Sequence, residues 1–565
     1  MPLVEDESIT FFYYINQGTF LPPLAELDAN NHFLHSALSY LFTSIFGKSL
    51  LAARLTALLS FPLFVIGCLH LASLMKNLVV RYAFVVSSVS CLSLVEFFAL
   101  SRGYALSFSL LAWSIYFLIQ AMDQQKQSLF YWSGICVVLG IYANLSLLNV
   151  GLLILLFSLF FSFQYSRLKS GIFLLVSIGA LYPGVRHLLT LKEANLLYFG
   201  EGGNMYRSTF ISLAQSYSDA HIDLAIYLLM GALSFLLILF ATQLKELTKK
   251  PFQWNSFQVT FLLLFGLIGM RLIQFYVLGV KFPVFRGALH FLLLFHMVLF
   301  FGFNQIKNKI FPAIASVLFA VFVLFDTYST ANLDYAREWR LNHFPRSFFS
   351  TVLEKQKVSK HILLTSGSGH YRMVWNFYNL QNDFSLNPLY SDDQPNYNCH
   401  YIIGNEELVD TINHPFSTIQ KSAYSDLRLF ERQENIAYAL LSKEEHTSIQ
   451  TDKDFIILHE DSTILKQESH LKIKWKAVLK SKEKEHLLHF VINVENDKKD
   501  RLYYRLISFN RDHLSLNEEL QTIEIEVPTN QLQAEKIKYT VYLWNPNFVP
   551  VYLETSAVWA YEKQR

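Results

Sequence analysis

The sequence is poor in charge and in cysteine, and its start lacks basic residues. Only 16% of the 565 residues are charged, against roughly 25% in an ordinary soluble domain. The four cysteines (Cys68, Cys91, Cys136 and Cys399) form no disulfide framework or zinc-binding pattern. Met1 to Glu7 carries three acids and no base, so we expect no cleavable signal peptide. The net charge of +2 indicates neither a nucleic acid nor an acidic partner.

The few charges are unevenly distributed along the chain. Residues 1–330 hold 32 charged side chains and residues 331–565 hold 60, so the two parts are about 10% and 26% charged. The second value is that of a soluble domain. This split excludes a single globular core, a disordered chain and a fibrous repeat, and it predicts a membrane body followed by a soluble tail.

Ten segments approach the roughly 20 apolar residues that a helix needs to cross the hydrocarbon core. They are residues 50–75, 82–100, 104–122, 129–145, 147–164, 170–190, 222–244, 256–278, 287–304 and 310–328. The division between the fourth and fifth is marked only by Asn144 and Asn149. One long helix there would leave nine spans.

The positive charges of the connecting loops favour ten spans and give an orientation. One set of alternate loops holds Lys76, Arg81, Lys126, Arg167, Lys169, Lys245, Lys249, Lys250, Lys307 and Lys309. The other set is longer but sparser, with Arg102, Lys192, Arg207, Lys281 and Arg286 as its main cations. We expect the basic set to be cytoplasmic, which places residues 1–49, residues 191–221 and the tail after about 328 outside. An N-terminal segment on the outer side of the membrane implies either that it crosses unaided or that a transmembrane helix precedes it, and we favour the second.

The first external segment combines acids, aromatics and a histidine. Glu5, Asp6 and Glu7 precede an aromatic run at 11–14, and Asp28-Ala29-Asn30-Asn31-His32 precedes an amphipathic stretch at 35–46. Acids before a helix are often simply a solvated cap that complements the helix dipole. That interpretation remains open for these three.

The order of these features resembles the first external loop of the GT-C glycosyltransferases. The likeness is to the branch of family 39, which contains the protein O-mannosyltransferases and the lipid A aminoarabinose transferases. Residues 97–106 (FFALSRGYAL) resemble its Arg-x-Tyr turn, and residues 283–289 (PVFRGAL) its late Arg-bearing entry into a span. The likeness covers about residues 1–328. Asn31-His32-Phe33 stands where the family has His-Pro-Pro, and the family's opening transmembrane helix has no counterpart before the acids.

The resemblance implies transfer of a sugar from a polyprenyl-phosphate donor to an acceptor at the outer face. Asp6 would be the general base, with Glu7 orienting the acceptor and Glu5 replacing Asp6 if the pair is shifted by one. The leaving phosphate needs cations or hydrogen-bond donors. The candidates for that role are Arg102, Tyr104, Arg271, Lys281, Arg286 and His32. We expect no metal ligands among these residues, and the need for a divalent metal stays open.

Several candidates also have purely structural interpretations. Arg271 would lie about 12 Å inside its span, where a charge needs a cavity or a partner, and Glu96 could be that partner. Arg286 and Lys281 could be interfacial anchors. His290 and His296 are six positions apart, which favours packing over metal binding. The loop 191–221 could be either a mobile lid or a connector.

After about residue 328 we expect two external soluble regions. Residues 329–450 mix helix and strand signals. The run 366–369 (SGSG) could suggest a phosphate-cradling loop, but it lacks the full dinucleotide fingerprint and a clear following helix, so we expect an ordinary turn. Residues 451–565 alternate with period two and predict an antiparallel β-sandwich. Its expected strands lie at 471–477, 487–494, 502–509, 523–527, 538–544 and 551–561.

The sequence therefore predicts a multi-pass membrane glycosyltransferase of the bacterial inner (plasma) membrane, with its soluble region on the periplasmic side of the cell envelope. Its partners would be the lipid-linked donor and a lipid, glycan or protein acceptor, with no nucleic acid. The main alternative is a transporter or lipid flippase, for which the sequence shows neither internal repeats nor broken helices. A non-catalytic scaffold is a third possibility. Donor sugar, acceptor and oligomeric state are left open.

Overall fold

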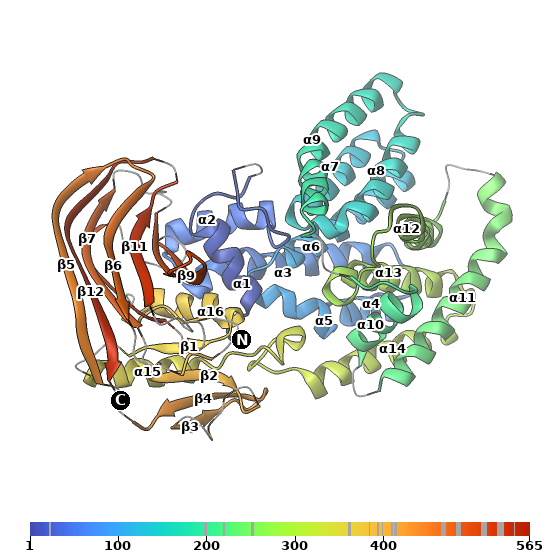
Figure 1. Ribbon diagram of the computed structural model, residues 1–565. Coiled ribbons are helices and arrows are strands. Elements are labelled where there is room, and N and C mark those ends of the chain that lie inside the picture. Colours follow the sequence, from blue (N-terminus) through green and yellow to red (C-terminus); the bar gives the residue numbers. More distant parts are fainter. Residues whose placement is uncertain are drawn as a thin grey trace. The chain divides into compact units, whose positions relative to one another are not determined.

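The chain forms two compact units in the computed structural model (Figure 1). The helical unit contains Met1 and Tyr13–Glu338, and the C-terminal unit contains Pro2–Phe12 and Trp339–Arg565. The structure describes residues 1–21, 24–196, 200–218, 221–249, 254–359, 363–382, 385–391, 395–397, 399–407, 409, 411, 415–434, 437–464, 471–481, 488–509, 517–527, 536–546 and 548–564.

The helical unit is built from helices joined by short connections. Its α-helices are α2 (Phe33–Phe46), α3 (Leu50–Ser73), α4 (Leu78–Ser90), α5 (Leu92–Val95), α6 (Tyr104–Gln124), α7 (Gln127–Ala143), α8 (Leu148–Ser162), α9 (Arg167–Glu193), α10 (Ile211–Tyr217), α11 (Ile222–Lys249), α12 (Ser256–Leu278), α13 (Leu289–Gln305) and α14 (Ile310–Thr330). Its shorter turns of helix are η2 (Glu96–Ala99), η3 (Leu145–Leu147), η4 (Tyr206–Phe210) and η5 (Phe285–Ala288). Two more turns, η1 (Phe11–Ile15) and η6 (Arg337–Trp339), lie where the chain passes between the units.

Within the described residues, eight helices are long and apolar enough to cross a membrane. A ninth candidate is α4 together with α5 and η2, which are bent by 54° at Cys91. Each of the ten predicted segments coincides with a helix, but two differ from a full straight span: the second is this bent pair, and the fourth is α7, with only 17 residues. The sequence pattern therefore found the apolar helices but not the bend, because Cys91 is as apolar as its neighbours.

The predicted division of residues 129–164 into two helices is confirmed. α7 ends at Ala143, and Asn144 adopts an extended backbone whose side chain accepts a hydrogen bond from the Ser146 amide at 3.0 Å. Small residues also let α7 approach α6 closely. Ser114 and Ser133 each donate to the other's carbonyl oxygen, at 2.7 and 2.8 Å, which is a common way for apolar helices to associate.

The C-terminal unit begins with two helices and a small mixed sheet. The helices α15 (Arg346–Val358) and α16 (Gly369–Leu380) accompany strands β1 (Thr365–Gly367), β2 (Tyr401–Asn405), β3 (Phe416–Lys421) and β4 (Leu427–Arg432). The strand order is β1-β2-β4-β3, with β1 and β2 parallel and the other pairs antiparallel. The short helix α1 (Glu5–Thr10) packs against α16, where the Phe11 and Phe377 rings lie 4.9 Å apart.

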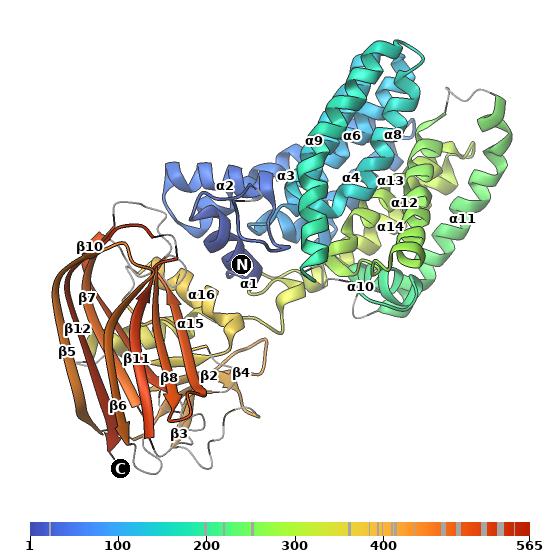
Figure 2. The same ribbon diagram turned by 45° about the horizontal axis from the view of Figure 1, so that its top comes forward.

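The rest of this unit is a pair of antiparallel sheets that share one hydrophobic core (Figure 2). The strands are β5 (Ala437–Thr451), β6 (Phe455–Ile464), β7 (Leu471–Ser481), β8 (His489–Asn496), β9 (Arg501–Ser508), β10 (Asn517–Val527), β11 (Lys536–Trp544) and β12 (Val551–Gln564). One sheet has the order β10-β7-β12-β5 and the other β6-β11-β8-β9. Inward residues alternate with polar ones, so Trp475 and Tyr539 are fully buried.

The predicted strands from 471 onward are confirmed, apart from Leu487, which lies outside the described residues. Between 366 and 369 the expectation of an ordinary turn is wrong. These residues join β1 directly to α16, and the Ser368 side chain caps the helix by accepting from the His370 amide at 3.5 Å. The helix was missed because Gly369 and four aromatic residues give its sequence a weak helical propensity.

Candidate functional site

A buried arginine lies at the turn between η2 and α6. Arg102 is only 2% exposed, and its Nη2 donates to Oδ1 of Asn30 at 2.8 Å. The preceding residue, Ser101, fixes the turn to two other helices: its Oγ donates to the Ala53 carbonyl at 2.8 Å and lies 3.2 Å from Nε2 of His35. The first loop, α2, α3 and the Arg102 turn are therefore held together by hydrogen bonds.

Gly103 allows this assembly to close. A Cβ atom at Gly103 would lie 1.8 Å from the Ala143 carbonyl oxygen and 2.9 Å from the Cβ of His32. No larger side chain fits without moving backbone. The glycine in the Arg-Gly-Tyr turn thus serves the close packing of α7 and the first loop against the base of α6.

His32 lies in the same environment as two of the predicted cations. Burial, together with the positive charges of Arg102 and Arg286, lowers the pKa of His32 well below its usual range. His35 adds to this effect, and hydrogen bonding to the Ala143 backbone opposes it. The imidazole is therefore neutral at physiological pH, and Nε2 makes no hydrogen bond within the described part of the chain.

Tyr104 joins this group through its ring. The ring centroid lies 5.4 Å from the His32 ring, 4.6 Å from the Phe97 ring and 6.0 Å from the Arg102 guanidinium carbon. An arginine over an aromatic face is stabilised by the ring's quadrupole. The structure thus places His32 and Arg102 around Tyr104, and the charge of Arg286 acts on His32. We call these four residues the cation cluster.

Two residues of this region were missed as candidates. Asn30 accepts the Arg102 hydrogen bond, and its own amide donates to Oδ1 of Asp28 at 2.7 Å. Tyr14 is buried, and its hydroxyl donates to the Glu26 carbonyl at 3.2 Å. Burial and the negative charges of Asp28 and Glu26 raise the pKa of Tyr14, so it stays a hydrogen-bond donor. The only sequence signal was the density of polar residues between 26 and 32.

Arg286 and Lys281 flank the entry to α13. Arg286 lies in η5, and its Nη1 forms an ion pair with Oε2 of Glu338 at 3.0 Å, with both side chains about one-fifth exposed. Lys281 is exposed, next to Phe282, whose backbone pairs with that of Glu201 through two 3.0 Å hydrogen bonds. Lys281 is thus placed beside the 191–221 loop.

The described part of that loop is ordered into helical turns. η4 and α10 follow Met205, and the Thr209 hydroxyl donates to the Pro283 carbonyl at 2.7 Å. Tyr198, Phe199 and Asp219, which the lid interpretation included, lie outside the described residues. An apolar cavity of about 240 Å³ lies between this loop and helices α11, α12 and α13, lined by Phe210, Leu264 and Phe291 among others.

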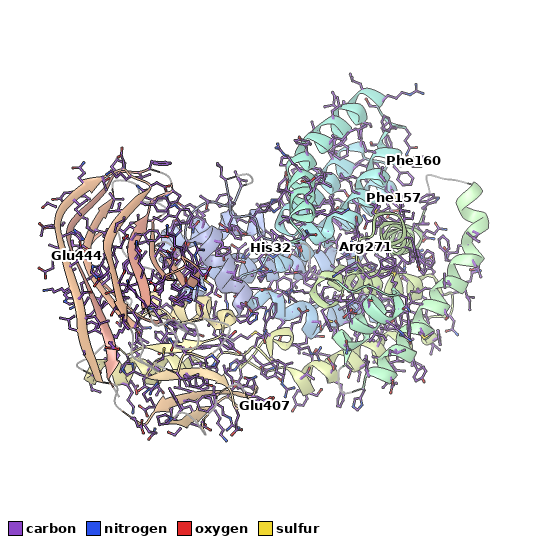
Figure 3. The ribbon with its side chains drawn as sticks, viewed as in Figure 1. His32, Phe157, Phe160, Arg271, Glu407 and Glu444 are labelled. Atoms are coloured by element: carbon purple, nitrogen blue, oxygen red, sulfur yellow. The ribbon has the colours of Figure 1, made fainter. Side chains whose placement is uncertain are left out.

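Arg271 has partners of its own, in the interior of the helical unit (Figure 3). It donates to Oε1 of Gln274 at 3.4 Å, and Gln274 pairs with the amide of Asn149 on α8 at 2.8 Å. With the Asn149 amide turned over, its oxygen also accepts from Arg271 Nε at 2.9 Å and Nη1 at 3.0 Å. The partners are amides rather than the carboxylate of Glu96, which instead accepts from the Arg337 backbone at 2.9 Å.

The predicted acids Asp6 and Glu7 lie on α1, in the C-terminal unit, and both are buried. Glu7 closes the first turn of the helix, since its Oε2 accepts from the Val4 amide at 3.2 Å. Glu5 lies 2.9 Å from Nδ1 of His370 on α16. The cap interpretation therefore describes Glu7, although this cap is buried rather than solvated.

The described residues contain no group of three or more His, Cys, Asp or Glu side chains that could hold a metal ion. His290 and His296 are both buried on α13, and His296 packs against Tyr217 with ring centroids 5.7 Å apart. The chemistry that the cation cluster can offer is binding of an anion by guanidinium and hydroxyl donors.

No known family model matches the chain. No curated protein matches it either. Solved structures of the VP2 protein of infectious bursal disease virus give weak matches. T=1 particles of a mutant VP2 match at 11% identity over 26% of this chain and 36% of that one, with a TM-score of 0.19. A VP2 subviral particle matches at 12% identity over 27% and 41%, with a TM-score of 0.18. Less than half of either viral chain is covered, and scores this low carry no argument about fold or function.

Proposed function

We propose that the protein is a membrane glycosyltransferase that moves a sugar from a polyprenyl-phosphate donor to an acceptor at the outer face of the membrane. The observation that carries this proposal is the cation cluster. A guanidinium that is 2% exposed, with a second arginine whose charge acts on the same histidine, suits a ligand with negative charge. Its setting in a bundle of apolar helices suits a lipid-linked ligand.

In this proposal the arginines stabilise the phosphate as the sugar leaves it. Negative charge develops on the phosphate oxygen in the transition state, and preorganised cations are worth most where water is excluded. Arg102 and Arg286 would supply this charge, and Tyr104 would orient the Arg102 guanidinium. Neutral His32 can donate or accept a hydrogen bond without adding to the charge.

The donor's isoprenoid chain needs an apolar surface close to these cations. The cavity of about 240 Å³ under η4 and α10 offers one. The Thr209–Pro283 hydrogen bond connects its wall to the segment that bears Arg286. We propose that this cavity receives the first isoprene units.

Asp6 is the proposed general base that accepts the proton of the acceptor hydroxyl. A carboxylate can do so when it lies within hydrogen-bond reach of that hydroxyl. The proposal gives Glu7 a supporting role, because its carboxylate holds the turn that carries Asp6. Residues 329–565 would then lie on the periplasmic side, as the distribution of loop charges indicates.

The experiment is transfer of radiolabelled sugar by the purified, full-length protein from a panel of polyprenyl-phosphate sugars. We expect transfer from one donor, its loss in Asp6→Asn, and a loss of at least a hundredfold in Arg102→Gln. Glu5→Gln on the same helix tests the alternative base, and it should retain activity if Asp6 is the base. Full activity of Asp6→Asn would remove Asp6 as the base. Failure with every donor by a correctly folded protein would overturn the function.

One observation favours the alternative of a transporter or flippase. The sequence suggested no broken helix, yet α4 and α5 meet at a bend of 54°, and transporters often bind their cargo at such breaks. The freed Ser90 carbonyl accepts from the Thr327 hydroxyl at 2.5 Å, so here the break is closed by a neighbouring helix. Transport of a fluorescent lipid-linked sugar across proteoliposomes by Asp6→Asn, with no transfer product, would support this alternative.

A further inference from the structure

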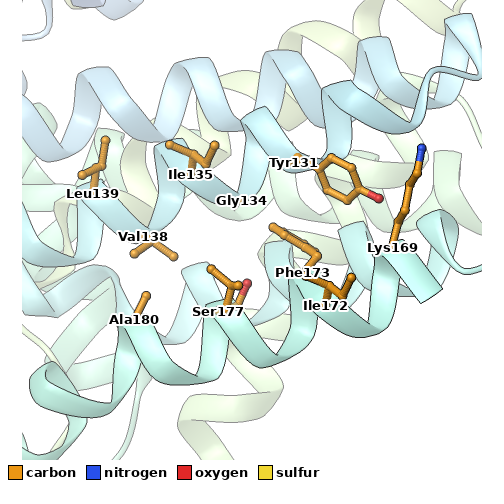
Figure 4. Close-up of a pocket in the computed structure, with 11 residues that line it drawn as sticks. Tyr131, Gly134, Ile135, Val138, Leu139, Lys169, Ile172, Phe173, Ser177 and Ala180 are labelled. Carbon is orange, nitrogen blue, oxygen red and sulfur yellow. The ribbon is translucent and has the colours of Figure 1, made fainter. Parts of the chain in front are cut away.

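An open apolar groove runs between α7 and α9 (Figure 4). Its volume is about 430 Å³, and its walls are mainly aliphatic side chains, including Ile135, Val138, Leu139 and Val176. This groove is separate from the cation cluster and shares no lining residue with it. The function proposed above does not use it.

Hydrogen bonds join the two helices at both ends of the groove. At one end Gln127 donates to the Ser170 hydroxyl at 3.4 Å, and at the other the Tyr142 hydroxyl donates to the Ala180 carbonyl at 2.5 Å. Between these ends the Phe173 ring forms the floor. It lies so close to Gly134 that a Cβ there would be 2.2 Å from the ring's Cζ. The groove is therefore a fixed feature of the fold.

One end of the groove is polar. Figure 4 shows the Lys169 ammonium and the Tyr131 hydroxyl at the same end, away from Leu139 and Ala180. The Tyr131 hydroxyl is buried and interacts with the Ser170 side chain. Its neighbour Ser170 already donates to Ser162 at 2.9 Å. A buried hydroxyl beside an ammonium is a favourable place for an anionic oxygen.

The neighbouring connections add to this positive charge. Lys126 lies in the α6–α7 connection, and Arg167 and Lys169 lie in the first turn of α9. Asp123 is the only acid among residues 120–130 and 160–172. These cations belong to the basic set that the distribution of charge assigns to the cytoplasm. An anionic headgroup at this end would be matched in charge.

The groove also has the length of one membrane leaflet. From Lys169 to Ala180 the α9 helix rises by about 16 Å, at roughly 1.5 Å per residue. Half of the hydrocarbon core is about 15 Å thick. A chain whose headgroup lies at Lys169 would thus end near the midplane, where Tyr142 closes the groove.

We propose that this groove binds an anionic glycerophospholipid of the cytoplasmic leaflet. Lys169 and Tyr131 hold the phosphate, and one acyl chain lies along Val138, Phe173 and Val176. A zwitterionic lipid of the same chain length fills the groove but leaves the positive end less well neutralised. A polyprenyl carrier is longer than the groove, so most of its chain would lie outside.

The first test is native mass spectrometry of the full-length protein titrated with phosphatidylglycerol and with phosphatidylcholine of identical acyl chains. We expect tighter binding of phosphatidylglycerol and about a fivefold loss of that preference in Lys169→Gln, the effect of one cation near an anionic headgroup. Arg167→Gln removes the same charge two residues away and should change the preference less than twofold. Equal binding of the two lipids, or equal effects of the two substitutions, would overturn the proposal.

The second test fills the groove. Ala180→Trp places an indole inside it, whereas Gly179→Trp faces open space and serves as the control, since nothing lies within 4 Å of a Cβ there. We expect Ala180→Trp to abolish retention of phosphatidylglycerol through purification and Gly179→Trp to leave it unchanged. If Ala180→Trp does not fold, Val138→Phe fills the same groove. Retained lipid in a folded groove-filling variant, or displacement of phosphatidylglycerol by equimolar polyprenyl phosphate, would contradict the assignment. Sugar transfer is measured in parallel, so loss of the lipid site and loss of the enzyme activity are distinguishable.

Discussion

Arg102 donates a 2.8 Å hydrogen bond to Asn30, across 72 positions of the sequence. The bond joins the first loop to the turn before α6, and it gives a guanidinium that is 2% exposed a neutral acceptor. This relationship connects the packing of the helical unit to its proposed chemistry.

Removing that acceptor should destabilise the protein. Asn30→Ala leaves a buried guanidinium hydrogen unsatisfied, which costs about 1–3 kcal/mol. We expect a lower midpoint of thermal unfolding, measured by intrinsic fluorescence in detergent. Asn30→Asp keeps an acceptor and should be as stable as the wild type, but its charge would compete with an anionic donor and raise KM. Wild-type stability of Asn30→Ala would show that the bond contributes nothing.

Gly103→Ala should be among the most damaging single substitutions. The added methyl would lie 1.8 Å from a backbone oxygen, so α7 or the first loop would have to shift. Overpacking that forces the backbone to move lowers the free energy of unfolding by about 3 kcal/mol or more. Gly171→Ala is the control, because nothing lies within 4 Å of its Cβ position and alanine favours a helix. We expect low yield of folded Gly103→Ala and normal yield of the control, measured by size-exclusion chromatography.

Much of the helical architecture could be predicted from the sequence, because a membrane leaves little choice. Long apolar runs must form helices, since every backbone polar group needs a partner inside the segment. Strands in the C-terminal unit could be predicted for a similar reason, because the alternation of apolar and polar residues with period two separates the buried face of a sheet from the exposed one. The bend at Cys91 was not predicted, and the Ser90 carbonyl that it frees accepts from the Thr327 hydroxyl of another helix.

The site was predicted in its residue types but not in its contacts. The Arg-x-Tyr turn and His32 share one environment, and the roles that the resemblance gives them stay predictions. Their partner Asn30 gave no signal, because asparagine in a loop is common. Likewise nothing in Asp6 or Glu7 indicated that α1 packs on α16. That packing includes the Glu5–His370 contact and the rings of Phe11 and Phe377, two phenylalanines of a chain that has 50.

The Arg286–Glu338 ion pair offers a way to separate structure from function. It is partly exposed, so we expect Glu338→Gln to lower stability by no more than about 1 kcal/mol. The double variant Arg286→Glu with Glu338→Arg restores the ion pair with the two charges exchanged between the positions. If Arg286 serves the donor phosphate, the exchanged protein should fold normally and still lose transfer activity. Recovery of activity in the exchanged protein would show that Arg286 acts only through the pair.

Asn149 should stabilise the folded protein by accepting hydrogen bonds from Arg271 in the interior of the helical unit. Its amide pairs with Gln274, and in the turned-over orientation it accepts from Arg271 directly. Asn149→Leu removes these bonds and leaves a charge poorly satisfied, so we expect a loss of about 1–3 kcal/mol in unfolding free energy. The double variant Asn149→Leu with Arg271→Met should recover most of that loss, because both partners are then apolar. A double-mutant cycle by thermal unfolding measures the coupling, and strictly additive losses would contradict the contact.

Acidification should weaken the region around His32 and His35. Burial and the charge of Arg102 lower the pKa of His35 to about 3, and His32 is shifted in the same direction. In the unfolded chain both would titrate near 6.5. Below that pH the unfolded state binds protons that the folded state does not, so stability falls as pH falls. The slope is at most about 1.4 kcal/mol per pH unit for each histidine.

Unfolding midpoints between pH 7.5 and 5.5 should therefore drop more steeply in the wild type than in His35→Gln. The control is His221→Gln, which alters an exposed histidine and should keep the wild-type slope. Identical slopes in all three proteins would mean that His35 takes up its proton without cost, and that the burial of this cluster is not maintained in solution.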